Sequence, residues 1–358
     1  MNETYHVIIA GGTGTRFWPR SRQKNPKQLL KIFGEESMIR LTFNRLREIS
    51  PSENILVVAS EFLCKNIRKH IPEIPQENYI VEPSAKNTAP AIGLAAINVY
   101  HRNSESVMCV YPSDHIILDA EKFKKSIEDG IAMALKKPSL VTMGIHPTYP
   151  ATGYGYIQCD CEKQESEGKI FKVKTFAEKP PLETAKKFLE SGNFLWNSGM
   201  FIWKTEILLL AMKTFMPELH ESLDAIYDAV GTDKYNIVLD REWEIVRSDS
   251  IDYGVLEKAK NVYVLKSDFR WSDLGSWKAL FDISEKNPQG NVENGEIISV
   301  NSKGSYVYSP NRLTAVVGLK DIVVINLEDT LLVASMEYAE EVKEVVRILQ
   351  KQDMMEYL

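Results

Sequence analysis

The sequence predicts an α/β protein whose main sheet is mostly parallel, followed by a small β-rich C-terminal part. In the first half, short apolar runs alternate with segments of helical periodicity. The apolar runs lie at residues 5–10, 54–59, 79–81, 107–111 and 140–145, and the helical segments at 38–49, 61–70, 87–101 and 120–136. Such alternation is typical of a parallel sheet that helices cover on both faces.

The second half changes character. Between residues 154 and 203 the pattern is richer in β, with one helix expected at 182–191. Asparagine, proline and glycine between 287 and 295 indicate a linker. Short β-like runs follow at 297–300, 305–308, 315–317, 322–325 and 331–333, and then a helix is expected at 340–349. We therefore predict two domains, residues 1–284 and 285–358.

Composition excludes several classes of protein. Of the 358 residues, 44% are hydrophobic and 26% charged, which is ordinary for a globular protein, and the net charge of −6 argues against nucleic acid as a partner. No apolar run has the length of a membrane span or the form of a signal peptide, so we expect a cytoplasmic protein without a membrane partner. The four cysteines and six histidines show no zinc-site spacing.

A glycine-rich turn directly follows the first predicted strand. Residues 11–16 read GGTGTR, and glycines there let a phosphate approach the backbone closely. The turn lacks the GK[ST] ending of a Walker loop, and Phe17 stands where a Rossmann fingerprint has its third glycine. Six lysines and arginines and no acidic residue lie between Gly11 and Gly34. A polyanion site is one interpretation; a tight turn followed by a solvated basic loop is the other.

Ligands of parallel sheets bind at the carboxyl ends of the strands. This rule places residues 11–16 and 112–115 (PSDH) at the same edge of the predicted sheet. It is the first indication of where a site lies.

Ordered sequence blocks then point to a family. AGGTGTRFWPRSR (10–22) and PKQ (26–28) resemble the opening of the sugar-nucleotide pyrophosphorylases, especially the mannose-1-phosphate guanylyltransferase branch. Further blocks match in order: EPSAKNTAPAI (82–92), YPSDH (111–115), TGYGYI (152–157), FAEKP (176–180), WNSGMF (196–201), SIDYGVLEK (250–258) and WSDLGSW (271–277). A weaker match continues through residues 321–333 and the last helix. The resemblance implies a Rossmann-like nucleotidyltransferase domain with a mixed sheet and a short β-helix-like C-terminal domain.

The resemblance also implies an activity, the transfer of GMP from GTP to mannose 1-phosphate. In such enzymes the sugar phosphate attacks the α-phosphorus in line and pyrophosphate leaves, with catalysis by positioning and charge neutralisation. It assigns the catalytic roles to Arg16 and Lys27, which neutralise the triphosphate, and to Asp114 and Asp273, which hold Mg²⁺. Lys179 contacts the phosphate of the sugar.

The same resemblance assigns the substrate-binding residues. Gly153, Glu178 and Asn197 meet the sugar hydroxyls. The residues that select the base come from the glycine-rich turn and the block at 82–88: Gly11, Gly12, Gly14, Thr15, Glu82, Lys86, Asn87 and Thr88.

Each assignment has a structural alternative. Asp114 could cap a turn and Asp273 could be a helix N-cap. Asn87 also stands at an N-cap position, Asn197 could serve a buried turn, and the Glu178–Lys179 pair could be an exposed charged turn. The ordered series of blocks favours the functional roles of Asp114, Asp273 and the Glu178–Lys179 pair.

Alternative functions also stay open. They are a guanylyl- or thymidylyltransferase for another sugar 1-phosphate, and a catalytically silent homologue that binds sugar nucleotide and regulates a partner. No histidine cluster follows His220, so we expect no phosphomannose isomerase activity in this chain. A homodimer is one alternative for the assembly.

Overall fold

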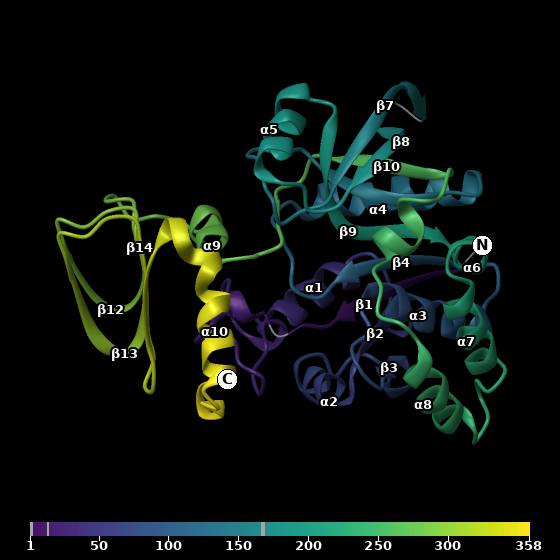
Figure 1. Ribbon diagram of the computed structural model, residues 1–358, viewed down its shortest axis with the longest axis horizontal. Coiled ribbons are helices and arrows are strands. Elements are labelled where there is room, and N and C mark those ends of the chain that lie inside the picture. Colours follow the sequence, from purple (N-terminus) through teal and green to yellow (C-terminus); the bar gives the residue numbers. More distant parts are fainter. Residues whose placement is uncertain (1–2, 13, 166–168) are drawn as a thin grey trace. The chain divides into compact units, whose positions relative to one another are not determined.

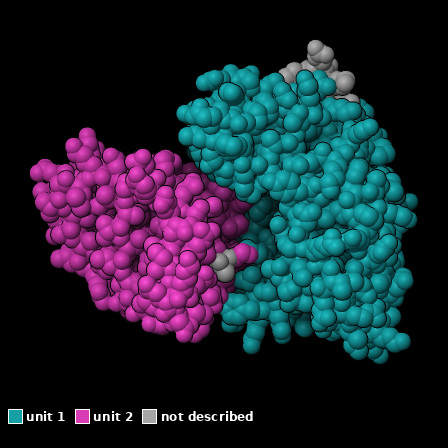
Figure 2. Space-filling view, in the orientation of Figure 1, with its two compact units in different colours: residues 1–11, 42–113, 117–271 teal, residues 12–41, 114–116, 272–358 magenta. Residues whose placement is uncertain are grey.

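The structure, a computed structural model, describes residues 3–12, 14–165 and 169–358. The chain forms two compact units, coloured separately in Figure 2. Unit 1 comprises Met1–Gly11, Thr42–Ser113 and Ile117–Trp271, and unit 2 comprises Gly12–Leu41, Asp114–Ile116 and Ser272–Leu358. The second unit therefore combines three separate stretches of sequence. The expected boundary at residue 284 stays a prediction.

The elements are labelled in Figure 1. The strands are β1 (Thr4–Ala10), β2 (Ile55–Ser60), β3 (Tyr79–Glu82), β4 (Val107–Pro112), β5 (Ile116–Ile117), β6 (Leu140–Ile145), β7 (Tyr156–Glu165), β8 (Ile170–Ala177), β9 (Phe194–Lys204), β10 (Val262–Ser267), β11 (Trp271–Ser272), β12 (Val292–Val300), β13 (Tyr306–Val317), β14 (Ile322–Asn326) and β15 (Leu331–Ser335). The α-helices are α1 (Met38–Arg47), α2 (Glu61–His70), α3 (Thr88–Arg102), α4 (Ala120–Lys136), α5 (Leu182–Ser191), α6 (Thr205–Phe215), α7 (Pro217–Tyr227), α8 (Tyr235–Ile245), α9 (Trp277–Ile283) and α10 (Val342–Lys351). Shorter helical turns used below are η1 (Thr15–Phe17), η2 (Lys27–Leu29), η5 (Asp252–Leu256), η6 (Met336–Glu341) and η7 (Met355–Tyr357).

Unit 1 is built on one mixed sheet. Within the described residues its strand order is β3-β2-β1-β4-β9-β6-β10-β8-β7. Strands β1 to β4 pair in parallel, as do β6 and β10, whereas β9 and β8 run against their neighbours. The prediction of a mixed sheet is confirmed: β1 to β4, β6, β7 and β10 run in one direction, and β8 and β9 run in the other.

Alternation along the strands assigns the two faces of this sheet. Val7 of β1 and Met108 of β4 belong to the large apolar core beneath α3, α6 and α7. On the opposite face, Tyr111 of β4 packs edge-on against Phe123 of α4. Because successive strand residues point to opposite faces, these runs of apolar residues bury both sides of the sheet. Helices on both faces in Figure 1 agree with this pattern.

Unit 2 carries a β-helix-like coil. Strands β12, β13 and β14 stack in parallel although only short loops connect them, and β15 returns antiparallel to β14. Tyr306 pairs with Val323, and Val300 with Val317, so equivalent positions of successive turns lie above one another. The expected β-rich C-terminal domain is confirmed.

Three details of the C-terminal prediction were wrong. The runs 305–308 and 315–317 are parts of a single strand, β13, because β12 and β13 stay paired across an irregularity. The linker ends before Val292, where β12 already begins, and Gly295 makes a bulge inside that strand instead of a loop. The final helix is preceded by the 3₁₀ turn η6 and becomes α-helical at Val342. In the part of the chain that is described, no helix is both long and apolar enough to span a membrane.

Gly295 is the position where the β-helix tolerates no side chain. Its φ is +111°, and a Cβ there would overlap the backbone carbonyl of Ser309. We expect Gly295→Ala to lower the free energy of unfolding by about 3 kcal/mol, measured by urea unfolding. The matched control is Gly290→Ala, where φ is +78° but no atom lies within 4 Å. That variant should lose only about 1 kcal/mol, and equal losses would show that the contact with Ser309 is unimportant.

Candidate active site

Unit 2 contains a polar hollow of about 340 Å³. The residues that line it come from all three of the unit's stretches of sequence: Gly14, Thr15, Arg16, Phe17, Lys27, Asp114, His115, Asp273, Leu274 and Gly275. Six of the predicted site residues are therefore gathered in one place, among them all four to which a catalytic role was assigned. In the sequence, residues 14–17 come after β1, and Asp114 and His115 come after β4.

Lys27 is the centre of this hollow. It begins η2, and its side chain is only 5% exposed. Its Nζ lies 2.8 Å from Oδ2 of Asp114 and donates a hydrogen bond of 2.7 Å to the backbone carbonyl of Asp273. A buried ammonium needs such partners, because leaving it unpaired is costly. One lysine thus joins the two predicted metal-binding aspartates.

The charge state of Asp114 follows from these neighbours. Burial alone would raise the pKa of its carboxyl. The charges of Lys27 and His115 and the hydrogen bond from Lys27 outweigh burial, so the pKa lies below its usual value. Asp114 is therefore a carboxylate at neutral pH, and it does more than cap a turn.

Asp273 lies in a tight turn before α9. Its Oδ1 accepts a hydrogen bond of 2.9 Å from the Gly275 backbone, and Leu274 between them has a φ of +47°. The helix N-cap is Ser276, whose hydroxyl accepts from the Ala279 backbone. The interpretation of Asp273 as the N-cap was wrong.

Gly14 brings the glycine-rich turn against Lys27. Its φ is +65°, and an added Cβ would collide with Cβ of Lys27. A residue with a side chain would therefore displace the lysine as well as strain the turn. Next to it, Nε of Arg16 is buried and has no hydrogen-bond partner among the described residues. Gly11 and Gly12 begin this turn, and the Gly12 carbonyl accepts a hydrogen bond from the side-chain amide of Gln28. Thr13 lies outside the described residues.

Unit 1 holds the second group of predicted site residues. Asn197 of β9 donates a hydrogen bond of 2.8 Å from Nδ2 to Asp252, and its Oδ1 accepts from the Thr142 hydroxyl and the Gly199 backbone. Its backbone N–H donates to the carbonyl of Gly155. The amide is thus fixed in orientation inside a polar network.

Asp252, the first residue of η5, was missed by sequence reasoning although it belongs to the block SIDYGVLEK. Burial and repulsion from Glu178 raise its pKa to about 7. Glu178 itself is paired with Lys179, whose side chain is 62% exposed and whose φ is +48°. Nothing in spacing along the chain predicts that residues 178, 197 and 252 meet, since they lie in different elements.

The remaining predicted residues surround the start of α3. Glu82 at the end of β3 is buried, and burial raises its pKa to about 7. Asn87 caps α3 by accepting from the Thr88 backbone, which confirms the N-cap interpretation. The backbone N–H of Ile251 donates a hydrogen bond to the Thr88 hydroxyl, and the backbone N–H of Asp249 donates one to the Lys86 carbonyl. Gly153 belongs to the loop before β7, and an added Cβ there would meet no atom within 4 Å.

The raised pKa of Asp252 predicts a pH dependence of stability. A carboxyl that titrates near 7 when folded and at its ordinary 3.8 when unfolded binds more protons in the folded state. Asp252 alone should therefore make the free energy of unfolding fall as pH rises from about 4 to 7, by less than about 1.4 kcal/mol per pH unit. Asp252→Asn should reduce this slope in urea unfolding, and Glu82→Gln should reduce it separately. The control is Asp240→Asn, at an exposed position of α8. A slope unchanged in Asp252→Asn would contradict the assignment.

Comparisons with known proteins identify the family of this chain. The family described as "Nucleotidyl transferase" matches residues 5–290, and the "MannoseP isomerase/GMP-like beta-helix domain" matches residues 295–349. The Xanthan biosynthesis protein XanB of Xanthomonas campestris pv. campestris is 37% identical over 349 residues, 97% of this chain and 73% of that protein. A mannose-1-phosphate guanylyltransferase of Salmonella muenchen is 36% identical over 364 residues, 100% of this chain and 76% of that protein.

A solved structure extends the similarity to the whole fold. The protein from Thermus thermophilus described as a mannose-1-phosphate geranyltransferase superposes with a TM-score of 0.88 at 30% identity. The similarity covers 97% of this chain and 99% of that one. The matches in sequence and structure thus span both compact units. The chain belongs to the nucleotidyltransferase family, and its curated relatives include proteins named mannose-1-phosphate guanylyltransferase.

Proposed function

We propose that this protein transfers GMP from GTP to mannose 1-phosphate and releases pyrophosphate. The observation that carries the proposal is that the similarity to proteins named for this reaction extends over nearly the whole chain. The polar hollow with its two cations and two aspartates supplies the chemistry that such a transfer needs. A phosphate oxygen of the sugar forms a bond to the α-phosphorus, and the bond from the α-phosphorus to pyrophosphate breaks.

Arg16 and Lys27 take the role of neutralising the triphosphate. Lys27 is already fixed by Asp114 and the carbonyl of Asp273, so little reorganisation is needed when negative charge develops. The buried Nε of Arg16 gives this residue a donor that a phosphate oxygen can satisfy. Backbone N–H groups of the glycine-rich turn add further donors.

Asp114 and Asp273 would hold a divalent cation, for which we propose Mg²⁺. Both line the same hollow, and carboxylate oxygens are the ligands that Mg²⁺ prefers. The lowered pKa of Asp114 keeps that ligand ionised at neutral pH. When bound, the ion neutralises phosphate charge and orients the α-phosphorus.

The sugar side of the reaction belongs to unit 1. Lys179 presents an exposed ammonium suited to the sugar phosphate, while Glu178, Asn197 and the backbone of Gly153 accept or donate to hydroxyls. Glu82, Lys86, Asn87 and Thr88, with Gly11, Gly12, Gly14 and Thr15, take the role of selecting guanine. A cytoplasmic location and a homodimer also remain predictions.

The metal assignment is tested by two matched variants. Asp114→Asn and Asp273→Asn should each lower kcat by at least about 100-fold at saturating Mg²⁺. The double variant should be little worse than either single one, because the two carboxylates act as a unit. Pyrophosphate release measures the rates. Asp114→Asn also removes the partner of Lys27, so thermal unfolding must confirm that each variant is folded. Near-normal turnover in a folded variant would remove that residue from the metal site.

Substrate selectivity tests the proposed reaction itself. In a panel of nucleotides and sugar phosphates, GTP with mannose 1-phosphate should give the highest kcat/KM. ATP should be worse by about 100-fold, because adenine leaves two buried polar groups unpaired at about 1–3 kcal/mol each. Glucose 1-phosphate differs by one hydroxyl and should lose about tenfold.

Two outcomes of the panel would contradict the proposal. The named reaction would be overturned if ATP gave the same kcat/KM as GTP, or if glucose 1-phosphate gave a higher kcat/KM than mannose 1-phosphate. Neither outcome would change the family.

A further inference from the structure

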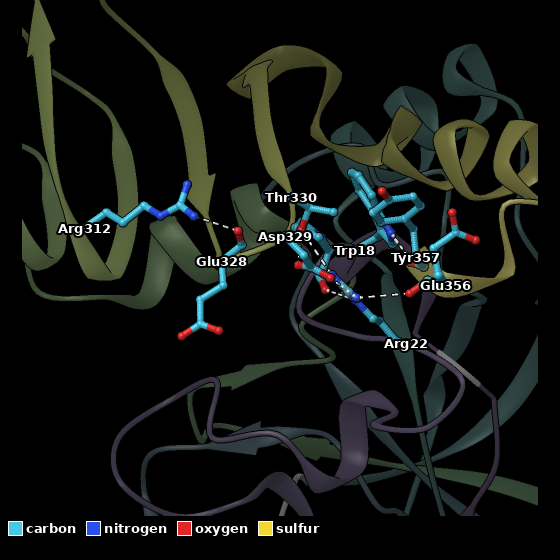
Figure 3. Close-up of polar contacts among 9 residues, drawn as sticks. Trp18, Arg22, Arg312, Glu328, Asp329, Thr330, Glu356 and Tyr357 are labelled. Carbon is cyan, nitrogen blue, oxygen red and sulfur yellow. Dashed lines mark hydrogen bonds and ion pairs between the residues drawn. The ribbon is translucent and has the colours of Figure 1, made fainter.

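The loop that carries Arg16 and Lys27 is anchored to the C-terminal β-helix. We call residues 14–27 the phosphate loop. Its residue Arg22 forms a two-pronged ion pair with Asp329, with Nη1 2.6 Å from Oδ2 and Nη2 2.8 Å from Oδ1 (Figure 3). The same Nη2 donates to the hydroxyl of Thr330 at 3.1 Å. A guanidinium bound at both prongs is held in direction as well as in distance.

Two more residues of the phosphate loop are attached to the same end of the chain. Trp18 donates from Nε1 to the carbonyl of Tyr357 at 2.8 Å (Figure 3), and the guanidinium of Arg20 lies 4.2 Å from the ring centroid of Tyr308. The backbone carbonyl of Trp18 accepts a hydrogen bond from the indole N–H of Trp277. All of these contacts lie within unit 2.

The turn that presents Asp329 is itself fixed. It connects β14 to β15 and is closed by a hydrogen bond from the Leu327 backbone to the Thr330 carbonyl. Arg312 of β13 donates to the carbonyl of Glu328 at 2.7 Å (Figure 3), and Asn311 donates to its carboxylate at 3.1 Å. Asp329 therefore stands on a turn that the β-helix holds in place.

The ion pair of Arg22 with Asp329 is connected to the hollow through the loop backbone. Arg22 and Asn25 exchange two backbone hydrogen bonds, which close the turn immediately before η2 and Lys27. Gly14 packs directly on Lys27 and lies close to Ser21. A displacement of Arg22 would therefore also displace Lys27, which follows only five residues later in the same loop.

We propose that Asp329 is a positioning residue for the transfer reaction: through Arg22 it holds the phosphate loop so that Lys27 and Arg16 meet the triphosphate. The inference rests on the proposed function. The side chains of Arg22 and Asp329 are 19% and 48% exposed, and pairs so exposed contribute little to overall stability. We therefore expect loss of this ion pair to lower kcat, because a small displacement of the groups that orient the reactants slows the reaction strongly.

The test compares Asp329→Ala with Asp282→Ala, which removes an exposed ion pair of similar length, 2.6 Å to Lys278, in the same unit. Asp329→Ala should lower kcat about tenfold or more while KM for mannose 1-phosphate changes less than about twofold, since the residues proposed for the sugar belong to unit 1. The double variant with Arg22→Ala should be no slower than Asp329→Ala alone. Asp329→Glu, which keeps the charge, should recover part of the rate, and Asp282→Ala should match the wild type.

A second measurement does not depend on turnover. Hydrogen exchange of peptides covering residues 14–27 should be faster in Asp329→Ala and unchanged in Asp282→Ala. Unchanged kcat and unchanged exchange in Asp329→Ala would overturn the inference, as would equal rate losses in both single variants. If the wild-type protein releases no pyrophosphate from GTP and mannose 1-phosphate, the proposed function fails. The exchange result then decides alone whether Asp329 holds the loop.

Discussion

The hollow of unit 2 depends on the contacts that the buried ammonium of Lys27 makes with Asp114 and with the backbone carbonyl of Asp273. It brings together a loop after β1, a loop after β4 and the turn before α9, which are far apart in the sequence. Without a carboxylate and a carbonyl within hydrogen-bond distance, a lysine only 5% exposed would be costly to keep charged. Together with the charge of His115, the same contacts keep Asp114 ionised, so the pair of Lys27 and Asp114 influences both the shape and the charge of the site.

The basic residues near the N-terminus divide into two functions. Arg16 and Lys27 line the hollow, whereas Arg22 is bound to Asp329 and Arg20 stacks on Tyr308. On charge alone, all of them could equally have belonged to a polyanion site or to a solvated basic loop. Neither interpretation anticipates that some of these cations fasten the loop to the C-terminal β-helix. Their partners lie some 300 positions away, and one sequence shows no sign of such a pairing.

Local patterns predicted local structure well. Helices at 61–70, 120–136 and 182–191 agree with α2, α4 and α5 residue for residue, because apolar periodicity and flanking caps decide such segments. The β-helix was harder: β13 contains Pro310 and Asn311, which normally end a strand, yet stacking on β12 keeps the strand continuous. Among site residues, the motif blocks indicated Lys27, Asp114 and Asp273, and the hollow contains all three. Asp252 was missed because only its burial beside Glu178 and Asn197 makes it unusual.

The two units place aspartates in opposite electrostatic settings. Asp114 faces an ammonium and has a lowered pKa, which suits a residue that must stay anionic toward cations and phosphates. Asp252 is buried beside another carboxylate and has a pKa near 7, so a substantial fraction of it is protonated at neutral pH. A protonated carboxyl can donate a hydrogen bond as well as accept one, whereas a carboxylate only accepts. That versatility matches hydroxyl groups, which also both donate and accept. Both settings are compatible with the proposal that the hollow of unit 2 binds phosphates and that unit 1 binds the sugar.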